Sequence, residues 1–89
     1  MEVFLVTPER EVWSGAATMV IARGTEGEVG ILAGHAPLLI RLMPEGIVRI
    51  QHDGTEEKAQ VKGGFMHVST DADVTRVDVL TDGVTLGES

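Results

Sequence analysis

The chain has 89 residues, enough for one small domain and too few for two. Its 14 acidic and 7 basic residues give a formal net charge of −7, which argues against direct binding to nucleic acid or anionic lipid, because both need clustered positive charge. Cysteine is absent, which excludes disulfide bonds and thiolate metal sites. We expect no signal peptide and no transmembrane segment, so membrane association would require a partner.

Short apolar or alternating runs, separated by turn residues, dominate the sequence and predict β-strands. In the first half, the predicted strands cover residues 2–7, 17–23 and 28–32, with residues 9–15 as a strand or a connection. A tight turn is expected between Gly24 and Gly27, and residues 33–37 have the composition of a loop. The apolar run at residues 38–43 is too short to be typed by its periodicity, and we expect it to end at the Pro-Glu-Gly of residues 44–46.

Two hairpins are predicted in the second half. Residues 47–52 pair with residues 57–62 across Asp53-Gly54, a dipeptide that favours tight hairpin turns. Residues 65–70 and 74–80 form the other hairpin, across residues 71–73, after a bend or bulge at Gly63-Gly64. We expect the domain to cover residues 1–82 and residues 83–89 to form a flexible tail.

The strand count, about eight or nine short and evenly spaced segments without a long helical period, predicts an all-β sandwich or barrel. Aromatic residues are few, so the core must be built from Val, Ile, Leu, Met and Ala. Of the three aromatic residues, Phe4 and Phe65 lie in predicted strands and are expected in the core, together with these aliphatic side chains; the third is Trp13.

Catalytic and metal-binding patterns are weak. His35, His52 and His67 could hold a metal ion, but they are 17 and 15 residues apart and lack the close pairing typical of metal ligands. Glu26 and Glu28 could form an acid–base pair, yet both belong to an expected exposed turn where alternation points them the same way. Nothing there would desolvate one carboxylate and raise its pKa, as acid–base catalysis requires.

The most distinctive segment is TEGEVGILAGHAPLL, residues 25–39. Its glycines Gly27, Gly30 and Gly34 are expected to shape loops, because glycine permits sharp turns and close backbone approach. Loops held on a rigid sandwich commonly carry binding function. An exposed glutamate beside such glycines suits docking onto a basic partner.

Four stretches together resemble a known family. They are VTPEREVWSG at residues 6–15, TEGEVGILAGHAPLL at residues 25–39, Gly63-Gly64-Phe65, and Val79-Leu80-Thr81-Asp82. In order and spacing they resemble the N-terminal domain of the epsilon-subunit family of bacterial F-type ATP synthases. The resemblance runs from about residue 3 to residue 82, nearly the whole chain.

The resemblance implies an all-β fold, a two-sheet β-sandwich of about ten short strands, at the foot of a rotating central stalk. It implies a non-catalytic subunit without a cofactor, which binds the gamma subunit and the membrane-embedded c-ring and couples proton translocation to ATP synthesis. Such a subunit is peripheral, at the cytoplasmic face of the bacterial inner membrane. The implied c-ring contacts are Glu28, His35, Ala36 and Pro37, and the implied gamma contacts are Leu38, Arg41 and Met43.

One departure from the family pattern concerns the C-terminus. Members usually continue into two inhibitory helices, whereas seven residues follow Asp82 here, too few for two packed helices. We therefore expect no self-inhibition and no ATP binding of that kind. Ala33 also stands where the family commonly has proline. Two alternatives stay open: a free-standing β-sandwich that binds carbohydrate or peptide, and a small metal-dependent enzyme that uses the three histidines.

Overall fold

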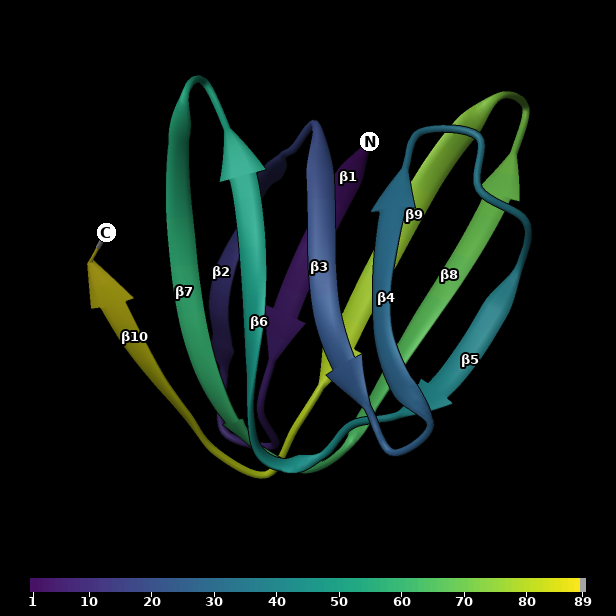
Figure 1. The fold of residues 1–89 in the computed structure, drawn as a ribbon. Helices are drawn as coiled ribbons and strands as arrows, with labels where there is room; N and C mark the ends of the chain where they lie inside the picture. Colours follow the sequence, from purple (N-terminus) through teal and green to yellow (C-terminus); the bar gives the residue numbers. More distant parts are fainter. Residues whose placement is uncertain (89) are drawn as a thin grey trace.

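A computed structural model describes residues 1–88, and this part of the chain contains ten β-strands and no helix. The strands are β1 (Glu2–Val6), β2 (Glu11–Ala16), β3 (Met19–Gly24), β4 (Gly27–Leu32), β5 (Leu38–Arg41), β6 (Pro44–His52), β7 (Thr55–Lys62), β8 (Phe65–Asp71), β9 (Val74–Leu80) and β10 (Val84–Glu88). The first sheet has the order β2-β1-β9-β8-β5, and the second has the order β10-β7-β6-β3-β4. They lie face to face (Figure 1), so the predicted two-sheet sandwich is confirmed.

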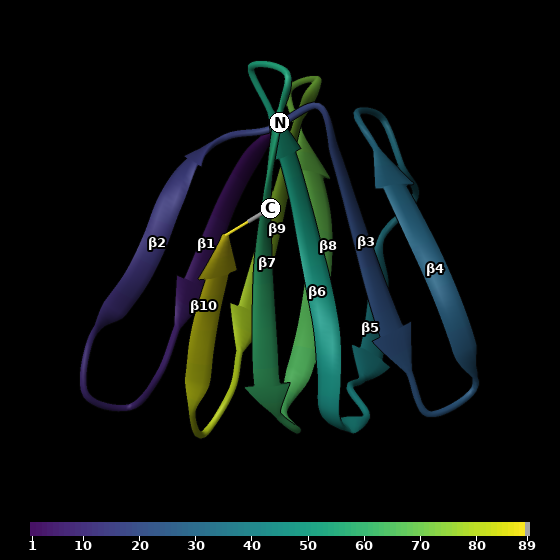
Figure 2. The same cartoon turned by 60° about the vertical axis from the view of Figure 1, so that its left-hand side comes forward.

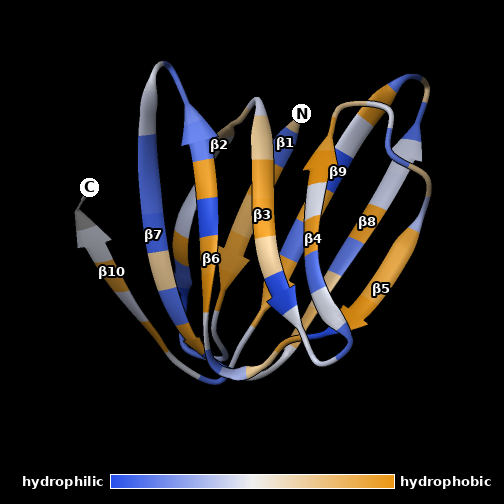
Figure 3. Ribbon diagram, viewed as in Figure 1, coloured by the Kyte–Doolittle hydropathy of each residue, from blue (hydrophilic) through white to orange (hydrophobic). Residues whose placement is uncertain are grey.

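The core lies between the sheets and consists of aliphatic side chains. Apolar and polar residues alternate along most strands (Figure 3), because successive side chains of a strand point to opposite faces. The fully buried side chains of highest volume are Leu5, Ile31, Leu42, Ile50, Met66, Val3, Val20, Val48, Val61, Val68, Val77 and Val79. The inner faces are therefore built from the residue types that the composition predicted.

The expectation that Phe4 and Phe65 belong to the core is wrong. Phe4 lies between the buried residues Val3 and Leu5, so its ring faces outward, where the guanidinium carbon of Arg76 lies 4.2 Å from the ring centroid. Phe65 is 43% exposed on the outer face of the first sheet. Strand alternation explains both placements: the neighbours of each phenylalanine along the strand point into the core, so the phenylalanine points outward.

The Asp53-Gly54 hairpin is confirmed. These two residues join His52 to its partner Thr55, and both have the positive φ angles, 48° and 76°, of a tight hairpin turn. The turn between β8 and β9 is shorter than predicted, because Asp71 already pairs with Val74.

Residues 44–46, predicted to end the apolar run at residues 38–43, form the first residues of β6. The ladder to β7 shifts register between Pro44 and Ile47, and Glu45 has a φ of 58°. A β-bulge thus accommodates the turn-forming residues, and the strand continues through them.

The flexible tail expected at residues 83–89 is also wrong for Val84–Glu88, which form β10. This strand pairs antiparallel with β7 (Figure 2). At its start, the carbonyl oxygen of Gly83 accepts hydrogen bonds from Lys62 N (2.9 Å) and from Thr81 Oγ1 (3.1 Å). β7 has a free edge, and all five residues of β10 pair with it. Ser89 lies outside the described residues.

The Gly63-Gly64 bend requires glycine at its second position. Both residues have positive φ, 67° and 105°, which side chains rarely adopt. A Cβ at Gly64 would overlap the carbonyl oxygen of Leu80 and lie 2.8 Å from Thr81 Cα, whereas one at Gly63 would meet nothing within 4 Å. Gly64 O also accepts a hydrogen bond from Leu42 N (2.8 Å), which ties the end of β5 to this bend.

We expect Gly64→Ala to lower the free energy of unfolding by roughly 3 kcal/mol or more, because the methyl group must displace backbone as well as adopt a strained φ. Gly63→Ala carries only the φ penalty, about 1 kcal/mol, and is the matched control. Urea unfolding followed by circular dichroism measures both. Equal losses for the two variants would contradict the close approach.

Candidate docking site

The side of the sandwich formed by β4 and β5 brings together the segment that the sequence singled out. These strands are the edges of opposite sheets, and residues 33–37 carry the chain from one to the other (Figure 1). At the lower end in Figure 1, backbone hydrogen bonds join the β3–β4 hairpin to the end of β5: Thr25 N donates to Arg41 O (3.0 Å), and Met43 N donates to Arg23 O (3.0 Å). We call this side, residues 24–41, the β4–β5 margin.

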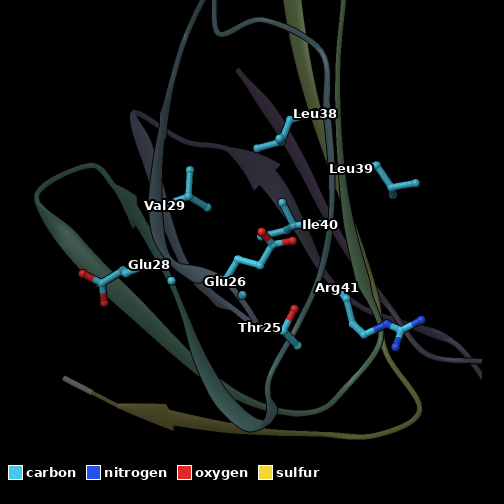
Figure 4. A pocket seen from close by; sticks show the side chains of 10 residues that line it. Thr25, Glu26, Glu28, Val29, Leu38, Leu39, Ile40 and Arg41 are labelled. Atoms are coloured by element: carbon cyan, nitrogen blue, oxygen red, sulfur yellow. The ribbon is translucent and has the colours of Figure 1, made fainter.

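A cleft of about 470 Å³ lies in this margin. Its lining residues are Gly24, Thr25, Glu26, Gly27, Glu28, Val29, Leu38, Leu39, Ile40 and Arg41. Val29, Leu38 and Ile40 are half-buried and pack against the core, so they give the cleft an apolar floor. The Glu26 side chain extends toward Ile40, whereas Glu28 extends away from the cleft (Figure 4). The expectation that alternation points both glutamates the same way is therefore wrong, because the φ of 128° at Gly27 interrupts the alternation.

Glu28 lies at the start of β4 with its side chain on the outer face of the second sheet. The residue is exposed, and its strand neighbour Arg23 is directly opposite in the register. Within residues 1–88, Glu28 forms no ion pair. An unpaired exposed carboxylate keeps its charge available for a basic partner.

His35, Ala36 and Pro37 occupy the loop at the other end of β4. His35 is half-buried, and its Nδ1 donates to Ala36 O (2.7 Å), which requires the proton on that nitrogen; Ala36 and Pro37 are exposed. About 13 Å of strand separates Glu28 from Leu32, where the loop begins, at ~3.3 Å per residue. The structure thus places these residues on one margin but at its two ends.

The three residues expected to contact gamma do not share one surface. Leu38 faces the cleft and the core, Arg41 is exposed on the outer face of the first sheet, and Met43 is 37% exposed beyond the end of β5. Sequence reasoning missed Leu39, which is 64% exposed and faces outward on the same side of β5 as Arg41. The alternation of β5 could have identified it once that segment was known to be a strand.

A further apolar surface extends from Arg41 across the first sheet. Cross-strand pairs connect Val6 to Leu80, Leu80 to Phe65 and Phe65 to Arg41, and we call these four residues the Phe65 row. Leu80 is 48% exposed, and the guanidinium carbon of Arg41 lies 5.7 Å from the Phe65 ring centroid. The row places large apolar side chains beside one cation, a composition that suits a protein partner.

The glycines expected to shape loops divide into two kinds. Gly27, with a φ of 128°, begins β4 directly after the two-residue turn Thr25-Glu26, and Gly34, with a φ of 87°, lies in the turn after β4. Gly30 instead lies inside β4, so its loop-shaping role is wrong. A Cβ there would approach Met19 Cε to 3.0 Å, which shows that the flexible Met19 side chain covers this position.

The three histidines lie in different surroundings. His67 is on the outer face of β8, opposite Leu39. His52 Nε2 lies 3.6 Å from Glu57 Oε1, and its ring centroid lies 5.2 Å from that of Trp13. In the described part of the chain, no group of three His, Cys, Asp or Glu side chains could hold a metal ion. The same part contains no helix able to cross a membrane.

These features define a β-sandwich with two exposed glutamates at its β4–β5 margin and an adjoining apolar row. The sequence matches the family described as "ATP synthase, Delta/Epsilon chain, beta-sandwich domain" over residues 1–87, and the chain belongs to that family. It is 52% identical over 69 residues to the ATP synthase epsilon chain of Frankia casuarinae, covering 78% of this chain and 81% of that relative.

Two further comparisons cover more of the chain. The ATP synthase epsilon chain of Thermobifida fusca is 46% identical over 86 residues, which span 94% of this chain and 61% of that relative. Among solved structures, a chain of the Euglena gracilis mitochondrial ATP synthase, in an OSCP/F1/c-ring structure, superposes with a TM-score of 0.84 at 27% identity. That superposition covers 94% of this chain and 51% of the other.

Adjacent leucines in β5 test the geometry of the margin. We expect Leu38→Ser to lower the free energy of unfolding by about 1–2 kcal/mol, because Leu38 packs against the core, and Leu39→Ser to change it by less than about 0.5 kcal/mol. Chemical denaturation of both variants measures the difference. A larger loss for Leu39→Ser would show that the two side chains are placed the other way round.

Proposed function

We propose that this chain is a non-catalytic, epsilon-type subunit of the central stalk of an ATP synthase, and that it couples proton translocation to ATP synthesis by docking on a gamma subunit and on the c-ring. The observation that carries the proposal is the β4–β5 margin, where the segment TEGEVGILAGHAPLL forms an exposed acidic edge and a loop that is hydrogen-bonded to both sheets. Family membership supports the same role. No cofactor is required for it.

The c-ring contact is assigned to Glu28, His35, Ala36 and Pro37. Because Glu28 and the loop lie at opposite ends of β4, a partner that touches both must lie along the margin rather than against one end of the sandwich. The exposed Glu28 carboxylate suits a basic loop, since complementary charges orient a complex and exclude wrong partners.

The gamma contact is assigned to Arg41 and Met43, extended by Leu39 and the Phe65 row; Leu38 supports this surface from beneath. Such a surface has apolar side chains at its centre and a cation at its rim, as is usual for stable protein interfaces. The loop of residues 33–37 leads directly into β5. A load that enters through this loop would therefore reach the gamma surface along one strand, whereas a load that enters at Glu28 would cross the sandwich from β4.

In this role the protein is peripheral, bound at the cytoplasmic face of a bacterial inner membrane through the complex. The chain spans 61% of the Thermobifida fusca relative. Inhibition and ATP binding are not proposed for the part that it covers. A free-standing ligand-binding module is not favoured, since the family assignment and the docking margin support a place in the complex.

Charge reversal at Glu28 tests the ring contact. In ATP synthase depleted of its epsilon-type subunit and reconstituted with this chain, we expect Glu28→Lys to weaken binding about twofold to fivefold at low salt and to lower proton pumping per ATP hydrolysed. The difference in binding should shrink at high salt, because exposed charges are screened.

Glu9→Lys is the matched control, since it makes the same charge change at an exposed position in the β1–β2 connection. Pumping and affinity should stay at the wild-type level in this variant. A Glu28→Lys protein that pumps and binds like the wild type at low salt would refute the assignment of Glu28.

A further inference from the structure

Two threonine hydroxyls lie on the first sheet's inner face, at the end next to the β8–β9 turn. Thr70 on β8 and Thr75 on β9 are directly opposite in the register. They continue the inner rows of Val68 and Val77, which are fully buried. Thr75 is itself 2% exposed. A polar pair therefore replaces the aliphatic pattern where the core meets the loop of residues 33–37.

These hydroxyls bond the loop backbone on both sides of the Gly34–His35 peptide. Gly34 N donates to Thr75 Oγ1 (2.7 Å), and Thr70 Oγ1 donates to His35 O (3.1 Å). The two hydroxyl oxygens are 3.2 Å apart. Each hydroxyl has one proton, and that of Thr70 is used on His35 O, so Thr75 must be the donor to Thr70. The hydrogen bonds thus run in one direction, from Gly34 N through Thr75 and Thr70 to His35 O.

These hydrogen bonds attach the loop to the first sheet, although the loop begins at the end of β4 in the second sheet. The loop leaves β4 of the second sheet with a local turn, in which His35 N donates to Leu32 O (3.1 Å). The threonine bonds attach the same residues to the β8–β9 hairpin of the first sheet. Gly34 has a φ of 87°, so its backbone needs such fixed partners to keep one conformation.

We propose that Thr70 and Thr75 are positioning residues that fix the Gly34–His35 backbone and so set the direction in which His35, Ala36 and Pro37 face a partner. The inference rests on the proposed function, because it takes this loop as part of the ring contact. A loop already held in its bound conformation loses less conformational entropy on binding, so removing the hydroxyls weakens the complex without removing any contact residue.

Three variants of the full chain test the proposal. Thr75→Val keeps the shape of the side chain and removes the hydroxyl, Thr75→Ser keeps the hydroxyl, and Thr70→Val removes the second hydroxyl at an exposed position that does not disturb the core. Hydrogen exchange of the Gly34 amide measures the hydrogen bonding of the loop. Titration against ATP synthase depleted of its epsilon-type subunit measures binding, and thermal unfolding confirms that each variant is folded.

We expect Thr75→Val and Thr70→Val to speed exchange of the Gly34 amide by about twofold to tenfold, the effect of one lost hydrogen bond, and to weaken binding within the same range. Thr75→Ser should stay within about twofold of the wild type in both measurements. Rescue by serine identifies the hydroxyl, rather than the volume of the side chain, as the cause.

The outcomes separate this inference from the proposed function. Wild-type exchange at Gly34 in both valine variants would overturn the hydrogen-bonded arrangement. Faster exchange with unchanged binding, in a series where Glu28→Lys does weaken binding, would overturn the positioning role and leave the proposed function standing. Failure of the wild-type chain to bind would refute the proposed function, and the positioning role would fall with it.

Discussion

Packing of inner rows that are aliphatic except for a few threonines is the constraint on which the rest of this structure depends. Branched and small side chains fill the space between the sheets, so no aromatic ring of residues 1–87 lies in the buried core. The phenylalanines occupy outward positions instead, each beside a guanidinium group. The burial that stabilises the sandwich thus leaves both phenylalanines on the outer face of the first sheet, where a partner can cover them.

The β4–β5 margin follows from how the chain changes sheets. Residues 33–37 connect the edge strands of opposite sheets. At one end, backbone hydrogen bonds of Thr25 and Met43 join the β3–β4 hairpin to the end of β5, and at the other the threonine pair holds the loop. Both ends of the margin are therefore fixed to the core. The proposed role in the central stalk would use this property, because a contact that deforms easily would transmit less of the applied force.

Local pattern predicted the strands and the Asp53-Gly54 turn, since both depend on side-chain alternation and on turn residues. It could not predict features that need a partner strand. β10 forms because β7 offers an open edge, Leu39 faces outward because β5 pairs with β8, and Thr75 meets Gly34 only in the folded chain. The role expected of residues 25–39 came from the family resemblance. The opposite directions of the Glu26 and Glu28 side chains could not be predicted, because they depend on the φ of 128° at Gly27.

Because the chain has no cysteine, single-cysteine variants can map its docking surface directly. Leu39→Cys, at the margin, and Thr85→Cys, on the exposed strand β10 at the opposite edge of the sandwich, should react equally with a maleimide in the isolated chain. In the reconstituted ATP synthase, alkylation of Leu39→Cys should slow by at least about tenfold while that of Thr85→Cys stays unchanged. Protection of Thr85→Cys with a freely reactive Leu39→Cys would contradict docking through the β4–β5 margin.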